Sequence, residues 1–167
     1  GYQVICKRIN FVGNEYFSEE EIKKVMHTSE GGFLEFVSRI GLSAAGAYKE
    51  EVFQIDKELI NYFYLNRGYM NIQVEEPHVF LSPDKSGIYI DISLKEGDQF
   101  FADLMDISGD IIYPEKDILG QIQMKTGDVL SYEVIQGDIR RISSLYLDDG
   151  YAYVNVIPRT QMDNEAK

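Results

Sequence analysis

The sequence predicts an α+β fold made of two tandem modules, each with the order β-α-α-β-β and with two helices packed on one face of a small mixed sheet. The main observation is an internal repeat, because Phe11-Val-Gly-Asn14 recurs 96 positions later as Ile107-Ser-Gly-Asp110. Further along, Gly68-Tyr69 recurs 82 positions later as Gly150-Tyr151, at the end of a helical pattern in both copies. Repetition of one supersecondary unit indicates a modular array rather than an enzyme built around a pocket.

The two offsets differ by 14 residues, which indicates that the first copy carries an insertion of about that length, at about 32–46. The first module then spans residues 1–97 and the second spans residues 98–167, with a short connection at Glu96–Gln99. The chain starts inside a strand-like segment, so we expect it to be a piece of a longer protein.

The first module opens with a strand, because apolar residues lie on one face of the segment from Ile5 to Phe11. Ser18 and Glu21 form a capping-box pattern, in which the two side chains satisfy free backbone N–H groups at the start of a short helix. A longer helix follows from about Tyr48 to Asn66. Its apolar residues are spaced by three and four positions: Val52, Ile55, Leu59, Ile60 and Phe63.

Two strand-like runs follow the long helix, Asn71–Ser82 and Gly87–Lys95, and the short loop between them predicts a hairpin. The second run alternates cleanly between apolar and polar residues. Its apolar face consists of Ile88, Ile90, Ile92 and Leu94. We expect this face to point at Leu59, Ile60 and Phe63, while the other face meets water.

The second module repeats this order. Pro114 suits the first position of a short helix, a long helix ends at Gly150, and a strand is expected from Ala152 to Thr160. The first strand of this module is marked by Phe101, Met105 and Ile107. No segment corresponds to Gly87–Lys95, so the second module lacks its last strand. We therefore expect further residues after Lys167, a strand borrowed from a neighbouring molecule, or a loosened second module.

Composition excludes several classes of function. The net charge of −12 over 167 residues disfavours binding to nucleic acid and adsorption to anionic membranes. Cys6 is the only cysteine, which excludes an internal disulfide and a multi-cysteine metal site. His27 and His78 are the only histidines and lie on different predicted elements. The sequence therefore predicts no catalytic site, no metal site and no cofactor.

Two surfaces are candidates for binding a partner. Pro77 lies in the second strand of the first module, as Pro158 does in the second, and proline within sheets is confined to edges, ends and bulges. The strand is therefore either an open edge or an edge protected by a bulge, and its candidate residues are Ile72, Val74, Val79 and Phe80. The insertion provides either core packing, such as one more helical turn, or a docking surface. Its candidate residues are Phe33, Leu34, Phe36 and Val37.

Three markers occur in order along the chain: Ile9-Asn-Phe-Val-Gly-Asn14, Glu96-Gly-Asp-Gln99 and Ser108-Gly-Asp110. With the order of the elements, they make the chain resemble tandem POTRA domains of the BamA family of outer-membrane protein assembly factors. The hairpin from Leu81 to Tyr89 is most similar to the third repeat of such an arm, leading into the fourth.

The resemblance implies a scaffold rather than an enzyme, at the periplasmic face of the outer membrane and as part of an outer-membrane protein. Such domains receive unfolded outer-membrane polypeptides by β-augmentation and dock accessory assembly lipoproteins. The usual contact is the second strand, which here is Asn71–Ser82. The resemblance also implies a C-terminal β-barrel in the parent chain and no direct membrane insertion by this fragment.

Other interpretations stay open. The chain could be a purely architectural spacer, or the POTRA arm of a relative in two-partner secretion or autotransporter assembly. A KH-like RNA-binding module also begins with β-α-α-β-β, but it needs a basic Gly-x-x-Gly loop between its helices. The corresponding stretch, Lys125–Ser131, has no such loop, and the net charge has the wrong sign.

Overall fold

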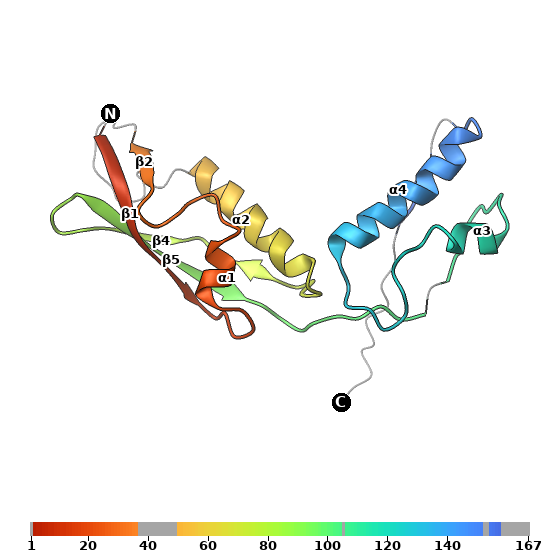
Figure 1. The fold of residues 1–167 in the computed structure, drawn as a ribbon, viewed down its shortest axis with the longest axis horizontal. Coiled ribbons are helices and arrows are strands. Elements are labelled where there is room, and N and C mark those ends of the chain that lie inside the picture. The colour runs from red at the N-terminus through yellow and green to blue at the C-terminus, as the bar shows by residue number, and fades with distance from the viewer. Residues whose placement is uncertain (1, 37–49, 105, 152–153, 158–167) are drawn as a thin grey trace. The chain divides into compact units, whose positions relative to one another are not determined.

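The computed structural model describes residues 2–36, 50–104, 106–151 and 154–157 (Figure 1). The chain divides into two compact units, Gly1–Gln99 and Phe100–Lys167. None of the helices in the described residues has the length and apolarity needed to cross a membrane.

A five-stranded mixed sheet forms one layer of the first unit. Its strands are β1 (Tyr2–Val12), β2 (Phe33–Phe36), β3 (Gln73–Val74), β4 (His78–Leu81) and β5 (Gly87–Lys95). The order is β2-β1-β5-β3, and β4 also pairs with β5. Strand β5 is parallel to β1 and antiparallel to β3 and β4. The last strand in the sequence is therefore central in the sheet.

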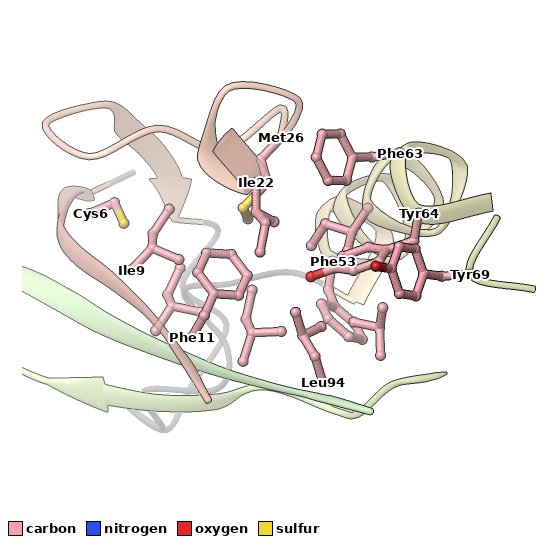
Figure 2. Close-up of a cluster of buried hydrophobic side chains, with 14 of the residues drawn as sticks. Cys6, Ile9, Phe11, Ile22, Met26, Phe53, Phe63, Tyr64, Tyr69 and Leu94 are labelled. Atoms are coloured by element: carbon pink, nitrogen blue, oxygen red, sulfur yellow. The ribbon is translucent and has the colours of Figure 1, made fainter. Parts of the chain in front are cut away.

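Two helices, α1 (Glu19–Lys23) and α2 (Glu50–Leu65), form the second layer. The predicted capping box is present at α1, where Ser18 and Glu21 each accept a hydrogen bond from the other's backbone N–H. Figure 2 shows the side chains of both helical segments directed at those of β1 and β5. The core of the unit lies between these two layers.

The predicted apolar face of β5 is confirmed. Its four residues, Ile88, Ile90, Ile92 and Leu94, are buried against Ile60 and Phe63 of α2 in one hydrophobic cluster. Cys6, Ile9 and Phe11 contribute the adjoining side chains of β1. The alternating pattern in the sequence thus assigned the correct face of the sheet to the core.

The predicted face of α2 is partly wrong. Leu59, expected in the core, is 36% exposed, and Ile55 is 47% exposed. Ile60 and Phe63 are buried as predicted, but the other buried residues of the helix are Phe53, Asp56 and Tyr64. The helix carries apolar residues around most of its circumference, so spacing alone did not decide which side faces the sheet.

The described part of the insertion forms a strand, which the sequence did not predict. Its first residues form β2, which pairs antiparallel with β1, from Tyr2 opposite Phe36 to Ile5 opposite Phe33. The insertion therefore adds a strand to one edge of the sheet. Residues 37–49 lie outside the described residues.

The second unit contains α3 (Glu115–Leu119) and α4 (Tyr132–Asp148). The expected first strand is not formed: the described residues around it make only an isolated bridge between Phe101 and Val129. Met105 lies outside the described residues, and 154–157 are not in a strand. In the first unit β1 depends on β5 for most of its pairing, and residues 100–167 contain no segment that matches β5.

Candidate functional site

Strands β3 and β4 form one edge of the sheet, because each pairs with β5 alone. Val74 lies opposite Leu94, and His78 lies opposite Asp91. From Val74 to His78 the edge advances four residues while β5 advances three, so residues 75–77 contain one extra residue. This is a β-bulge, and it contains Pro77. The candidate strand is therefore interrupted by a bulge, and the four residues of β4 that follow the bulge form an edge of the sheet.

The backbone of β4 presents free hydrogen-bonding groups on its outer side. The N–H of Ser82 donates to the carbonyl of Gly87 over 2.8 Å. In an antiparallel ladder alternate residues direct their backbone groups towards the partner strand, so Phe80 and His78 also face β5. Val79 and Leu81 therefore direct their N–H and C=O groups away from β5. No hydrogen bond joins these outward groups to another described residue.

The outer edge of β1 differs from this edge, because carboxylates occupy it. Glu30 accepts a hydrogen bond from the N–H of Ile9 over 2.9 Å, and Glu19 accepts one from the N–H of Phe11 over 3.4 Å. The bond from Ile9 and then the bond from Lys23 lower the pKa of Glu30. Side chains thus block the β1 edge past β2, whereas no described residue occupies the β4 edge.

The four predicted edge residues separate into two groups. Val74 belongs to the buried core, and Ile72 and Val79 are partly buried against it. Phe80 is 53% exposed. Val74 is therefore unable to offer its side chain to a partner, and Phe80 is the candidate whose side chain meets solvent.

The predicted docking residues of the insertion lie at the opposite edge of the sheet. Phe33, Leu34 and Phe36 are on β2, and Val37 lies outside the described residues. Because β2 is the other end of the strand order, the two candidate surfaces do not form one site.

The hairpin that follows β4 is held by one carboxylate. Asp84 accepts hydrogen bonds from the hydroxyls of Ser82 and Ser86 and pairs with Lys7 of β1. These hydrogen bonds hold the pKa of Asp84 well below its usual range. The turn is thus tied to two strands, which fixes the end of the β4 edge.

Sequence reasoning did not assign a role to two buried carboxylates. Asp56 on α2 accepts hydrogen bonds from the N–H groups of His27 and Thr28, over 2.6 and 3.0 Å. Asp138 on α4 accepts the equivalent bonds from Gln123 and Met124, over 2.8 and 3.2 Å. The signal was in the sequence, because Asp56 and Asp138 are separated by the repeat offset of 82 residues.

An aromatic cluster repeats in the same way. Phe17 contacts Tyr64 and Tyr69 edge to face in the first unit. In the second unit Tyr146 contacts both Tyr113 and Tyr151 edge to face. These contacts explain the repeated Gly-Tyr pairs as packing at the end of each long helix.

Glu96, in the connection, is also a structural residue. Its buried carboxylate accepts hydrogen bonds from the N–H groups of Glu15 and Tyr16 and from the hydroxyl of Tyr64. Burial, and then the bond to Glu96, raise the pKa of the Tyr64 phenol well above its usual range. The hydrogen bond from Tyr64 to Glu96 ties α2 to the segment that follows β5.

The second unit has a hollow of about 380 Å³ on the side of α4. It is lined by Gln121, Gly137, Arg140, Arg141, Ser144, Leu145 and Asp148. Arg141 is already engaged, because its guanidinium donates to the carbonyl of Gln121 and to Asp138. Within the described ranges there is no group of three or more metal-ligating side chains.

Relatives of this chain are assembly factors of the outer membrane. The outer membrane protein assembly factor BamA of Nitratidesulfovibrio vulgaris is 27% identical over 169 residues, which is 99% of this chain and 20% of that protein. A putative outer membrane protein assembly factor of Treponema pallidum is 27% identical over 163 residues, which is 93% of this chain and 18% of that protein. The chain thus spans about a fifth of the length of these relatives.

Solved structures show the same fold. BamA POTRA3-5 of Haemophilus influenzae has a TM-score of 0.69 at 19% identity, covering 86% of this chain and 54% of that one. BamA of Haemophilus ducreyi lacking POTRA domains 1-3 has a TM-score of 0.64 at 16% identity, covering 98% and 27%. The family model POTRA, described as a surface antigen variable number repeat, matches residues 4–97 and again residues 103–167. Two consecutive matches over most of the chain show that this protein belongs to the POTRA family, as a tandem of two domains similar to those of BamA.

Proposed function

We propose that this chain is part of the periplasmic arm of an outer-membrane protein assembly factor, and that it binds unfolded outer-membrane polypeptides in extended form at the β4 edge. The observation that carries the proposal is the outward direction of the N–H and C=O groups of Val79 and Leu81. The names of the relatives support the assembly role. The contrast with β1, whose edge Glu30 and Glu19 occupy, supports β4 as the accepting edge.

Binding would occur by β-augmentation, in which backbone hydrogen bonds provide affinity that tolerates many sequences. Two outward-facing residues offer four hydrogen bonds to an added strand, and each contributes about 0.5–1.5 kcal/mol net. A total of about 4 kcal/mol corresponds to a dissociation constant of about 1 mM. The β4 edge therefore suits weak, reversible contact with a client that must be passed on.

The opposite edge, at β2, is the surface that we assign to accessory assembly lipoproteins. Phe33, Leu34 and Phe36 lie there, and Val37 follows them in the sequence. The β-barrel of the parent protein would lie elsewhere in the longer chain. The net charge of −12 supports protein partners rather than nucleic acid.

The test is a titration of an isotope-labelled chain with a peptide copied from a transmembrane β-strand, followed by amide chemical shifts. We expect the shifts to concentrate in β4 and the adjoining residues of β5. Val79→Pro should sharply reduce them, because it removes one of the four outward groups but no hydrogen bond to β5. Val79→Ala is the matched control, since it loses the same side-chain packing and keeps the N–H group.

Shifts confined to α1 and α2, or none at millimolar peptide, would contradict binding at the edge and favour a helix-face contact or an architectural spacer. Unchanged binding by Val79→Pro would contradict the augmentation mechanism. The thermal unfolding midpoints of both variants should be compared with the parent, so that loss of binding is separated from loss of folding.

A further inference from the structure

Phe80 is an exposed aromatic residue at the outer end of a row that crosses the sheet. It lies opposite Tyr89 of β5, which in turn lies opposite Arg8 of β1. Phe80 is 53% exposed and Tyr89 is 36% exposed. The row lies on the open face of the sheet, which we define as the face turned away from α1 and α2.

The bulge at Pro77 is what places Phe80 on the open face. Val74 faces the core, and Phe80 follows it by six positions, an even number. In a regular strand two residues separated by an even number lie on the same face. The extra residue in the bulge reverses this relation, so Phe80 points to the open face while Val79 and Leu81 pack towards the core.

The backbone geometry fixes how a bound strand would meet Phe80. Because the N–H and C=O of Phe80 face β5, a residue placed opposite it on a strand added in antiparallel direction forms a pair without mutual hydrogen bonds. In antiparallel sheets such pairs bring the side chains closest together. An aromatic residue at that position would pack directly on the Phe80 ring.

The positions on either side of this residue have a different environment. They would lie opposite Val79 and Leu81, whose side chains are partly buried against the core. Aliphatic side chains at these positions would extend the hydrophobic layer between the sheet and the helices. The β4 edge therefore offers one open aromatic contact between two aliphatic contacts.

We infer that Phe80 makes the β4 edge selective for extended segments in which an aromatic residue lies between two aliphatic residues. This inference rests on the proposed binding of extended polypeptides at the same edge. It specifies which class of segment binds best, and it attributes this selectivity to the side chain of Phe80.

The test uses two host peptides that differ only at the central residue, Val-Phe-Val against Val-Thr-Val, flanked by lysines for solubility. We expect the parent chain to bind the phenylalanine peptide about fivefold more tightly. In Phe80→Thr, which keeps a residue suited to strands, the preference should vanish while the threonine peptide binds within about twofold of the parent. Tyr89→Thr is the matched control, because Tyr89 is one strand further from the bound peptide and the preference should remain.

Two results would overturn the inference and leave the proposed function standing: equal binding of both peptides by the parent chain, or an unchanged preference in Phe80→Thr. A preference lost equally in Tyr89→Thr would also overturn it, because the selectivity would then belong to the open face as a whole. Failure of both peptides to bind the parent chain would overturn the proposed function as well.

Discussion

Asp56 and Asp138 perform the same task in the two units. Each projects from a long helix and accepts hydrogen bonds from two consecutive backbone N–H groups that follow the short helix. Asp56 also accepts a hydrogen bond from the hydroxyl of Thr28. A buried carboxylate is tolerated when its oxygens are satisfied in this way. In each unit the aspartate therefore links the long helix to the backbone that follows the short helix, through hydrogen bonds rather than through side-chain packing.

We expect Asp56→Ala to lower the free energy of unfolding by about 3 kcal/mol, because it leaves the N–H groups of His27 and Thr28 without an acceptor at about 1–3 kcal/mol each. Urea unfolding followed by circular dichroism measures the loss. Glu58→Ala, an exposed position on the same helix, is the control and should change the stability by less than about 0.5 kcal/mol. Similar values for the two variants would show that the buried carboxylate is not a structural link.

Glu30 makes a pH-dependent contribution to the free energy of unfolding. Its pKa is lowered by the hydrogen bonds from Ile9 and then Lys23. The stability that it contributes is therefore present above the unfolded value of 4.5 and is lost as the pH falls through the lower pKa of the folded state. In Glu30→Gln, which does not titrate, the free energy of unfolding should fall less steeply below about pH 4.5. Parallel pH profiles for the two proteins, measured by urea unfolding, would contradict this assignment.

At the scale of elements, the two sides of α2 have different roles. Ile60 is fully buried beneath the helix, while its neighbour Leu59 is 36% exposed. Asp56 lies on the buried side of the helix and accepts hydrogen bonds from the loop at His27 and Thr28. This polar contact agrees with the observed orientation, which the apolar residues of the helix alone did not specify.

Alanine substitution of the two neighbours tests this orientation. Ile60→Ala should cost about 2–5 kcal/mol, because it opens a cavity between α2 and β5. Leu59→Ala should cost less than about 1 kcal/mol, since much of its side chain already meets water. Chemical denaturation of both variants gives the comparison, and equal losses would place Leu59 in the core as the sequence pattern suggested.

The sequence predicted the elements that depend on local periodicity. The alternation in β5 identified its buried face, and the capping box identified the start of α1. The sequence did not predict that Val74 and Phe80 lie on opposite faces, because the bulge at Pro77 shifts the pattern by one residue. It also missed β2, since a four-residue strand inside an insertion has too few alternations to be recognised.

At the scale of the whole molecule, the two units differ in how far the side chains of their long helices, α2 and α4, are buried. Ile60, Phe63 and Tyr64 of α2 are buried, whereas the residues at the repeat offset on α4, Ile142, Leu145 and Tyr146, are only partly buried. The described residues of the second unit include no paired strands over α4. Fewer buried apolar contacts imply a lower free energy of local opening.

We therefore expect the amides of α4 to exchange with solvent faster than those of α2 and β5 in the dilute chain, as measured by hydrogen exchange with mass spectrometry. Exchange of α4 as slow as that of β5 would contradict a loosened second unit. The same measurement at increasing protein concentration distinguishes a loosened unit from one that borrows a strand. A borrowed strand would protect the α4 amides only as the chain associates.

The central position of β5 determines when the first unit is able to fold. Strand β1 pairs with β5 across a long sequence separation, as between Ile5 and Gly87, and parallel pairing at such separations is intrinsically slow. When the chain emerges from its N-terminal end, Ile5 of β1 appears 82 residues before its partner Gly87. The apolar face of β1 has no parallel strand to cover it during that interval. Folding of the unit therefore behaves as a late, single event, triggered by the arrival of its last nine-residue strand.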